Sequence, residues 1–174
     1  SIMQKQQRLR SEEIPHVIAT VVRTNSSTAA TPGMKALVLE NGKFEEGWLG
    51  GGCVTSAVRS AAKAAIQTGE AILVCMRPED LLDEEINTDM VTLARNGCPS
   101  KGSLDIFVEP IIPLPELIIF GNGPVALSLV YIARGFGFKL TVCGKIEGEE
   151  FQADRSFSTL SEMKQHTNSK ANKY

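Results

Sequence analysis

The sequence predicts an α/β protein, with an N-terminal mixed-sheet α/β unit followed by a partial Rossmann-like β-α-β unit. Three observations support this fold class. Short apolar runs alternate with one alanine-rich helical run in the first part of the chain. Three prolines between Pro110 and Pro115 then interrupt the pattern, because proline is excluded from helix interiors and central strands. After them the apolar run Leu117-Ile118-Ile119-Phe120 leads into a glycine turn, Gly121-Asn122-Gly123-Pro124-Val125-Ala126.

The first unit is assigned to residues 1–109 and is expected to form a sheet with one long helix. Asn41-Gly42 is typical of a hairpin turn, so the runs on either side of it should pair. The helix is expected from Cys53 to Gly69, because alanines recur through it and glycine commonly ends a helix. Residues 78–89 are acidic and have one apolar helical face. The expected strands are 14–24, 35–39, 44–48, 71–76 and 104–109.

The rest of the chain is divided into a proline-rich linker, 110–116, and a second unit, 117–174. The G-x-G-x-x-A turn precedes a helix at 125–134 and a strand at 139–143, which is the opening of a dinucleotide-binding fold. That strand ends in Cys143-Gly144-Lys145, where a ribose-binding carboxylate is expected; Lys145 would instead suit a 2′-phosphate. The polar residues that follow suffice for one short helix or strand. We therefore expect a sheet that is either truncated or completed by a partner.

Composition excludes several classes of function. The chain has 174 residues, a formal net charge of −2 and 43% apolar residues, so it has material for a core and no strong charge to hold nucleic acid. No apolar run approaches membrane-spanning length, and the N-terminus lacks the features of a signal peptide, so we expect a cytoplasmic protein. The four cysteines form no CxxC pair and there are only two histidines, which disfavours a metal site.

The segment Gly47-Trp48-Leu49-Gly50-Gly51-Gly52-Cys53 is the clearest candidate for a functional loop. Consecutive glycines cost conformational entropy, so they indicate a tight turn or a close approach of the backbone to another group. Because a helix should follow, the loop would present free N–H groups and a partial positive charge to phosphate or another anion. Cys53 lies where that field would favour a thiolate. The alternative interpretation is a sharp turn with a half-buried cysteine.

A second loop, Asn96-Gly97-Cys98-Pro99-Ser100-Lys101-Gly102, precedes a strand that ends in Phe107-Val108-Glu109-Pro110. Together with Val17-Ile18-Ala19-Thr20-Val21-Val22 and the glycine loop, these segments resemble the XdhC/CoxI family of accessory factors for molybdenum hydroxylases such as xanthine dehydrogenase. The segments follow one another in the family's order. The resemblance ends in the Gly121-Asn122-Gly123 turn, so it covers most of the chain.

The resemblance implies a protein that binds molybdenum cofactor (molybdopterin) transiently and assists its sulfuration and insertion into a client hydroxylase. It implies that both loops line the cofactor site, with Cys53 and Cys98 holding the metal or passing on sulfur. The alternative is that both thiols are small buried hydrophobes. Such a protein would be a chaperone rather than a turnover enzyme, with a molybdenum hydroxylase and a cysteine desulfurase as partners. The residues assigned to the cofactor are Gly50, Gly51, Gly52, Cys53, Ser100, Lys101, Gly102, Gly121 and Gly123.

The chain also departs from the family pattern. Ser100-Lys101-Gly102 stands where a cysteine commonly precedes two glycines, a form similar to the CoxI-like branch, and Thr55 stands where glutamate is frequent. Two other functions stay open: an NAD(P)-dependent oxidoreductase that uses the second glycine turn, and a non-catalytic scaffold. Arg23 and Lys35 would suit either a phosphate or surface ion pairs. We expect a homodimer, because the second unit is too short to cover its own apolar surface.

Overall fold

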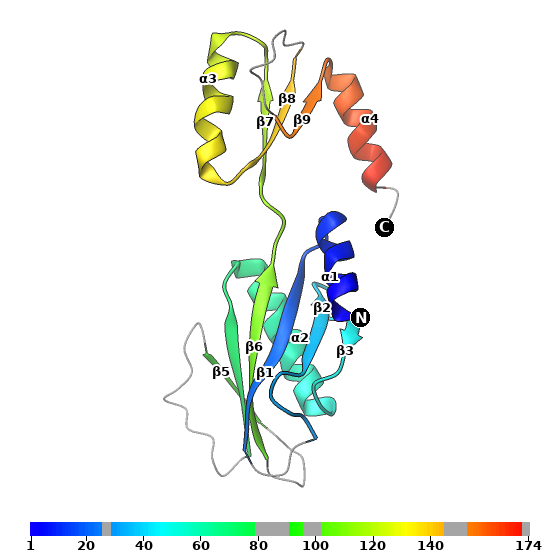
Figure 1. Ribbon diagram of the computed structural model, residues 1–174, viewed down its shortest axis with the longest axis vertical. Helices are drawn as coiled ribbons and strands as arrows, with labels where there is room; N and C mark the ends of the chain where they lie inside the picture. Colours follow the sequence, from blue (N-terminus) through cyan, green and yellow to red (C-terminus); the bar gives the residue numbers. More distant parts are fainter. Residues whose placement is uncertain (26–28, 79–90, 96–101, 145–152, 172–174) are drawn as a thin grey trace. The chain divides into compact units, whose positions relative to one another are not determined.

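The structure is a computed structural model that describes residues 1–25, 29–78, 91–95, 102–144 and 153–171 (Figure 1). Its contacts divide the chain into two compact units, Ser1–Pro113 and Leu114–Tyr174, which we describe separately. The predicted α/β class is confirmed. In the described residues the first unit has a six-stranded mixed sheet and the second a three-stranded parallel sheet.

The sheet of the first unit has the strand order β3-β2-β1-β6-β4-β5. Neighbouring strands are antiparallel except for β4 and β5, which are parallel. The central strands β1 and β6 are the longest. The strands are β1 (His16–Asn25), β2 (Lys35–Leu39), β3 (Phe44–Gly47), β4 (Ile72–Arg77), β5 (Val91–Arg95) and β6 (Ser103–Ile111).

The strand directions bring many chain segments to one end of this sheet, which we call the loop end. Strands β1, β4 and β5 finish at the loop end and β6 begins there, as the pairs Asn25↔Ser103 and Arg77↔Arg95 show. Strand β3 runs in the same direction as β1, and β2 runs in the opposite direction. Helix α2 (Gly52–Thr68) follows β3 and therefore also begins at this end (Figure 1). The glycine loop before α2 and Gly102, the residue before β6, thus adjoin the loop end.

Helix α2 covers one face of the sheet and forms its main core. The predicted helix is confirmed within one residue at each end, because Gly51 is its N-cap and Gly69, with φ +77°, ends it in the left-handed conformation. Alternate strand residues pack against it, among them Val21 and Ile106, both fully buried. The helical residues of this core are Val54, Val58, Ala61, Ala62 and Ala65.

Two elements of the first unit were not expected. Helix α1 (Ile2–Ser11) contacts β2 and β3, buries Leu9 and places Lys5 Nζ 3.0 Å from Glu46 Oε2. Strand β5 extends the sheet beside β4. Of the acidic segment 78–89, all but Pro78 lies outside the described residues.

Strand β6 continues through Pro110 to Ile111, two residues further than the sequence predicted. Proline is accommodated there because Pro110 pairs with Val17 of β1, whereas the pairing of β6 with β4 stops at Val108, so no partner on that side needs a donor. Residues 112–115 lie outside regular structure.

The second unit confirms the predicted strand–helix–strand order with parallel strands. Leu117–Phe120 pairs with Leu140–Cys143, and a third parallel strand follows. The polar tail forms both a strand and a helix, where one short element was expected. The elements are β7 (Glu116–Phe120), α3 (Pro124–Ala133), η3 (Arg134–Phe136), β8 (Lys139–Cys143), β9 (Arg155–Phe157) and α4 (Leu160–Ala171).

Candidate functional site

The glycines of the loop before α2 serve two different purposes. Gly50 is buried with φ +150°, and a Cβ there would lie 2.9 Å from Val54 Cγ2. Gly47 has φ +88°, and its Cβ would lie 2.2 Å from the Lys35 carbonyl oxygen. These two positions therefore require glycine for the chain to reach α2 at all.

Gly51 and Gly52, by contrast, have open space around them. A Cβ at either position would meet nothing within 4 Å, and both residues are exposed. The helical hydrogen bonds begin with the Thr55 N–H donating to the Gly51 carbonyl at 3.0 Å, so the N–H groups of Gly52, Cys53 and Val54 precede them. The first turn carries no acidic side chain. The fold tolerates side chains at these two glycines, and their absence leaves the backbone at a helix N-terminus open to a ligand.

Cys53 is the exposed thiol among the cysteines that the structure describes. It lies in the first turn of α2, whereas Cys75 and Cys143 are 6% and 7% exposed and belong to strands. Cys98, Ser100 and Lys101 lie outside the described residues, and Gly102 is buried immediately before β6. Because β6 begins at the loop end, the structure brings Gly50, Gly51, Gly52, Cys53 and Gly102 to one end of the sheet.

A charged cluster that the sequence analysis did not assemble also lies at the loop end. Asp105, 3% exposed, lies on β6 between β1 and β4. Arg23 of β1 donates to its Oδ2 from Nε at 2.8 Å, with Nη2 at 2.5 Å. Nη1 of Arg77, on β4, lies 2.6 Å from Oδ1 and forms an ion pair with it, without the alignment of a hydrogen bond. One buried carboxylate therefore holds two guanidinium groups that come from neighbouring strands.

The electrostatics of this cluster follow from burial and charge together. Burial alone would raise the pKa of the Asp105 carboxyl, but the close contacts and positive charges of Arg77 and Arg23 outweigh it and lower that pKa. Cys75 lies directly opposite Asp105 on β4. Burial, and then the negative charge of Asp105, raise the pKa of the Cys75 thiol, so this cysteine stays protonated.

A cavity of about 490 Å³ adjoins the charged cluster. It is lined by Arg23, Thr24, Asn25, Arg77, Ser103, Leu104 and Asp105. One feature of the sequence points to the cluster, because Asp105 lies within an otherwise apolar strand run. The alternation of that run does not predict which residues pair with Asp105.

Two further charged residues, Lys35 and Glu109, belong to strands β2 and β6. Lys35, proposed for phosphate or ion pairing, donates from Nζ to the Thr20 hydroxyl at 2.9 Å. Glu109 pairs with Ile18, near the end of β6 that lies away from the loop end. Glu109 is therefore not part of the site.

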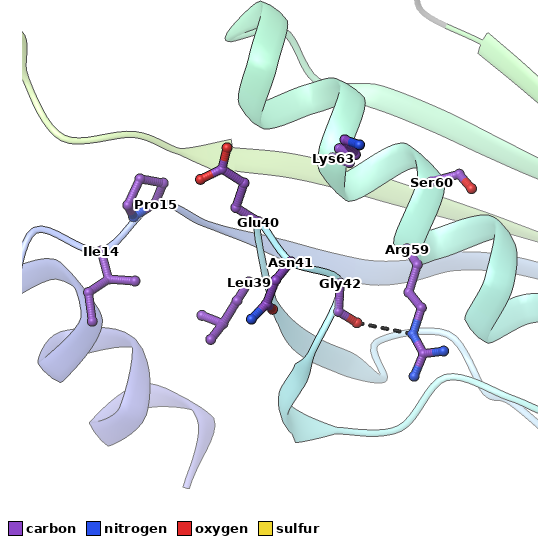
Figure 2. A pocket seen from close by; sticks show the side chains of 9 residues that line it. All are labelled: Ile14, Pro15, Leu39, Glu40, Asn41, Gly42, Arg59, Ser60 and Lys63. Atoms are coloured by element: carbon purple, nitrogen blue, oxygen red, sulfur yellow. Dashed lines mark hydrogen bonds between the residues drawn. The ribbon is translucent and has the colours of Figure 1, made fainter. Parts of the chain in front are cut away.

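A larger cavity, of about 700 Å³, lies at the opposite end of the first unit (Figure 2). It is bounded by the β2–β3 hairpin and by Arg59, Ser60 and Lys63 of α2. Arg59 is held there, since its Nε donates to the Gly42 carbonyl at 3.0 Å and its guanidinium lies 5.8 Å from the centre of the Phe44 ring. None of the residues predicted for the site lines this cavity.

The glycine turn of the second unit forms a separate feature. The Gly121 N–H donates to the Cys143 carbonyl at 2.9 Å, and Gly121 has φ +116°. A Cβ on Gly144 would lie 2.6 Å from the Gly121 carbonyl oxygen, so the end of β8 packs closely against the turn. Gly123 is the N-cap of α3 and Pro124 opens that helix. Lys145 lies outside the described residues.

The geometry of the first unit can now be compared with known proteins. Residues 9–76 match the model of the XdhC and CoxI family. The predicted resemblance is confirmed over this range, which contains strands β1 to β4, the glycine loop and Cys53. The second loop, the Gly121 turn and Asp105 lie beyond the matched range.

Among solved structures, the chain is similar to a crystal structure described as a xanthine dehydrogenase from Bacillus halodurans. The two are 17% identical, with a TM-score of 0.45, and the alignment covers 91% of this chain and 68% of that one. Similarity at this level carries no argument about function. No curated protein matches the chain. Among its described helices, none has the length and apolar character needed to cross a bilayer.

Proposed function

We propose that this protein is an accessory factor of a molybdenum hydroxylase, which binds molybdenum cofactor and assists its sulfuration and insertion. The observation that carries the proposal is the exposed Cys53 thiol beside the open backbone of Gly51 and Gly52, within the range that matches the XdhC and CoxI family. A pterin cofactor with anionic groups and a metal–sulfur centre needs these two kinds of contact.

The residues at the loop end suit this cofactor in distinct ways. The free N–H groups at the start of α2 would bind an anionic part of it, and the missing side chains at Gly51 and Gly52 allow a close approach. Cys53 would orient the metal or the transferred sulfur, because thiolates are preferred ligands of soft metal centres. Cys98, Ser100 and Lys101 stay proposed members of the site. When bound, the cofactor supplies the molybdenum centre that the client enzyme uses.

The partners in this proposal are a molybdenum hydroxylase client, a cysteine desulfurase and a second copy of the chain. A homodimer is supported by the apolar surface of α3, where Val125 is 74% and Tyr131 is 80% exposed. On this account the protein hands its ligand on and turns over no substrate of its own.

The second unit supports one other candidate function, nucleotide binding as in NAD(P)-dependent oxidoreductases. The observation in its favour is the close turn at Gly121, between parallel strands and before the N-terminus of α3. The residues Cys143 and Gly144, which end the second strand, supply no carboxylate for a ribose.

The proposed function is tested by the Cys53→Ser variant. We expect this variant to fold like the wild type, because the side chain is exposed at a loop–helix junction, and to lose most cofactor retention or client activation. The readouts are molybdenum bound per protein and the activity of a reconstituted client hydroxylase. Ser56→Ala, an exposed change on the same helix, is the matched control. Full client activation by Cys53→Ser would remove the thiol from the mechanism.

A further inference from the structure

The cluster of Arg23, Asp105 and Arg77 has a net positive charge, because two arginines pair with one aspartate. Asp105 supplies one negative charge, and the two guanidinium groups supply two positive ones. In the described part of the chain, neither arginine pairs with a second carboxylate. A single arginine would neutralise a buried aspartate, so the second one needs another explanation.

The backbone of β1 is shaped to aim Arg23 at this place. The pairing of β1 with β6 shifts between Val21 and Arg23, because Val21 pairs with Ile106 and Arg23 pairs with Asp105. In a regular strand Val22 would lie opposite Asp105, and Arg23 would point to the α2 face. The irregularity turns Arg23 onto the face of Asp105, as β-bulges beside functional sites often do.

The two guanidinium groups keep donors available after they have paired with Asp105. Arg23 uses Nε and Nη2, and Arg77 uses Nη1, which contacts Asp105 and also donates to the Met76 carbonyl at 2.9 Å. Each guanidinium has five N–H bonds, so Nη1 of Arg23 and Nε and Nη2 of Arg77 stay available. The Arg23 side chain is 72% exposed, and both arginines line the cavity of about 490 Å³.

We propose that Arg23 and Arg77, oriented by the buried carboxylate of Asp105, bind the phosphate group of a phosphomonoester ligand in this cavity. Arginine forks match the geometry of phosphate oxygens, and a fixed carboxylate behind them removes the entropy cost of ordering two long side chains. Asn25 and Ser103, which also line the cavity, add neutral donors. The assignment of that phosphate to molybdopterin rests on the proposed function, whereas the phosphate site itself does not.

The first test titrates the full chain with inorganic phosphate at low ionic strength, by calorimetry. We expect saturable binding that Arg23→Gln weakens about tenfold or more, the loss that follows from removing a charge-assisted hydrogen bond. Arg8→Gln is the matched control, because Arg8 is also an exposed, ion-paired arginine of the first unit, with Nη2 3.1 Å from Glu45 Oε1. We expect this control to bind like the wild type. Absence of saturable binding, or equal binding by wild type and Arg23→Gln, would overturn the site.

A second measurement does not depend on the folding of a variant. In NMR spectra of the wild-type protein, the side-chain N–H resonances of Arg23 and Arg77 should shift on addition of phosphate, while that of Arg8 should not shift. Shifts at all three arginines alike, or at none, would contradict the proposal. If phosphate binds at Arg23 but intact molybdenum cofactor does not bind, the phosphate site stands and the proposed function fails.

Discussion

Among single residues, the buried His16 should make the stability of the protein depend on pH. It is fully buried, and its Nδ1–H donates to the Ile14 carbonyl at 2.8 Å, while Nε2 has no partner in the described structure. Burial lowers the pKa of His16, and the charge of Arg10 lowers it further. The unfolded chain, with a histidine pKa of about 6.5, therefore binds a proton more readily than the folded one as the pH falls.

The free energy of unfolding should consequently decrease as the pH is lowered from about 6.5 towards the depressed pKa of His16 in the folded state. His16→Asn keeps a donor near the Ile14 carbonyl but does not titrate, so its stability should depend less on pH in that window. Urea unfolding at a series of pH values measures the slope. Equal slopes for wild type and variant would show that His16 does not cause the dependence.

Local sequence patterns predict the burial of single residues. They do not predict contacts that depend on pairing between strands far apart in the sequence. His16 lies within an apolar run of the sequence, a pattern that favours burial, and its ring is buried. The role of Asp105 could not be predicted, since its partner Arg23 is 82 residues away and reaches it only through the β-bulge. Cys75 lies in an apolar strand run, a pattern that favours burial, but its place opposite Asp105 depends on strand pairing.

Among the structural elements, the glycine loop before α2 contains one glycine that the fold requires, Gly50, and one that the fold does not require, Gly52. Gly50→Ala should lower the free energy of unfolding by roughly 1–3 kcal/mol, because φ is +150° and the added Cβ would lie 2.9 Å from Val54 Cγ2. Gly52→Ala should leave stability equal or raise it by up to about 1 kcal/mol, because the position is helical and open. Chemical denaturation of both variants measures these changes.

The same pair of variants then reports on the ligand. A methyl group at Gly52 would stand over the free N–H groups of α2, so this stable variant should retain less molybdenum cofactor than the wild type. Unchanged retention would show that the ligand does not approach the helix N-terminus there.

Elements with strong local signals were predicted closely, and weakly patterned ones were not. The strand Lys35–Leu39 and the helix ended by Gly69 agree with the sequence, because a hairpin turn and a left-handed glycine fix their ends. Helix α1 was missed because it is mostly polar and buries only Leu9 among its residues. Strand β5 is an edge strand whose position depends on β4 rather than on its own pattern.

In the molecule as a whole, the strand order brings the site residues together, and local sequence patterns cannot predict that order. The order β3-β2-β1-β6-β4-β5 places β6, late in the sequence, between β1 and β4. This insertion unites Arg23, Asp105 and Arg77 and brings Gly102 to the end where α2 begins. The sequence identifies the glycine loop and Gly102 locally, but only non-local strand pairing brings them to one end of the sheet.

The exposed apolar face of the second unit predicts self-association. Val125, Tyr131 and Ile132 of α3 are 74%, 80% and 59% exposed, which is costly in water unless another surface covers them. We expect a homodimer at micromolar concentration, and we expect Ile132→Glu to shift it to monomer. Light scattering at several concentrations is the measurement, with Ser60→Glu on α2 as a control that should stay dimeric. A wild-type protein that is monomeric throughout would contradict the dimer.

The most direct test of the central claim is a titration of the purified protein with molybdenum cofactor and, separately, with NAD(H) and NADP(H). We expect saturable binding of molybdenum cofactor that Cys53→Ser and Gly52→Ala both weaken, with no comparable binding of either nicotinamide nucleotide. Tight nicotinamide binding without binding of molybdenum cofactor would contradict that claim and would place the function in the Gly121 turn of the second unit.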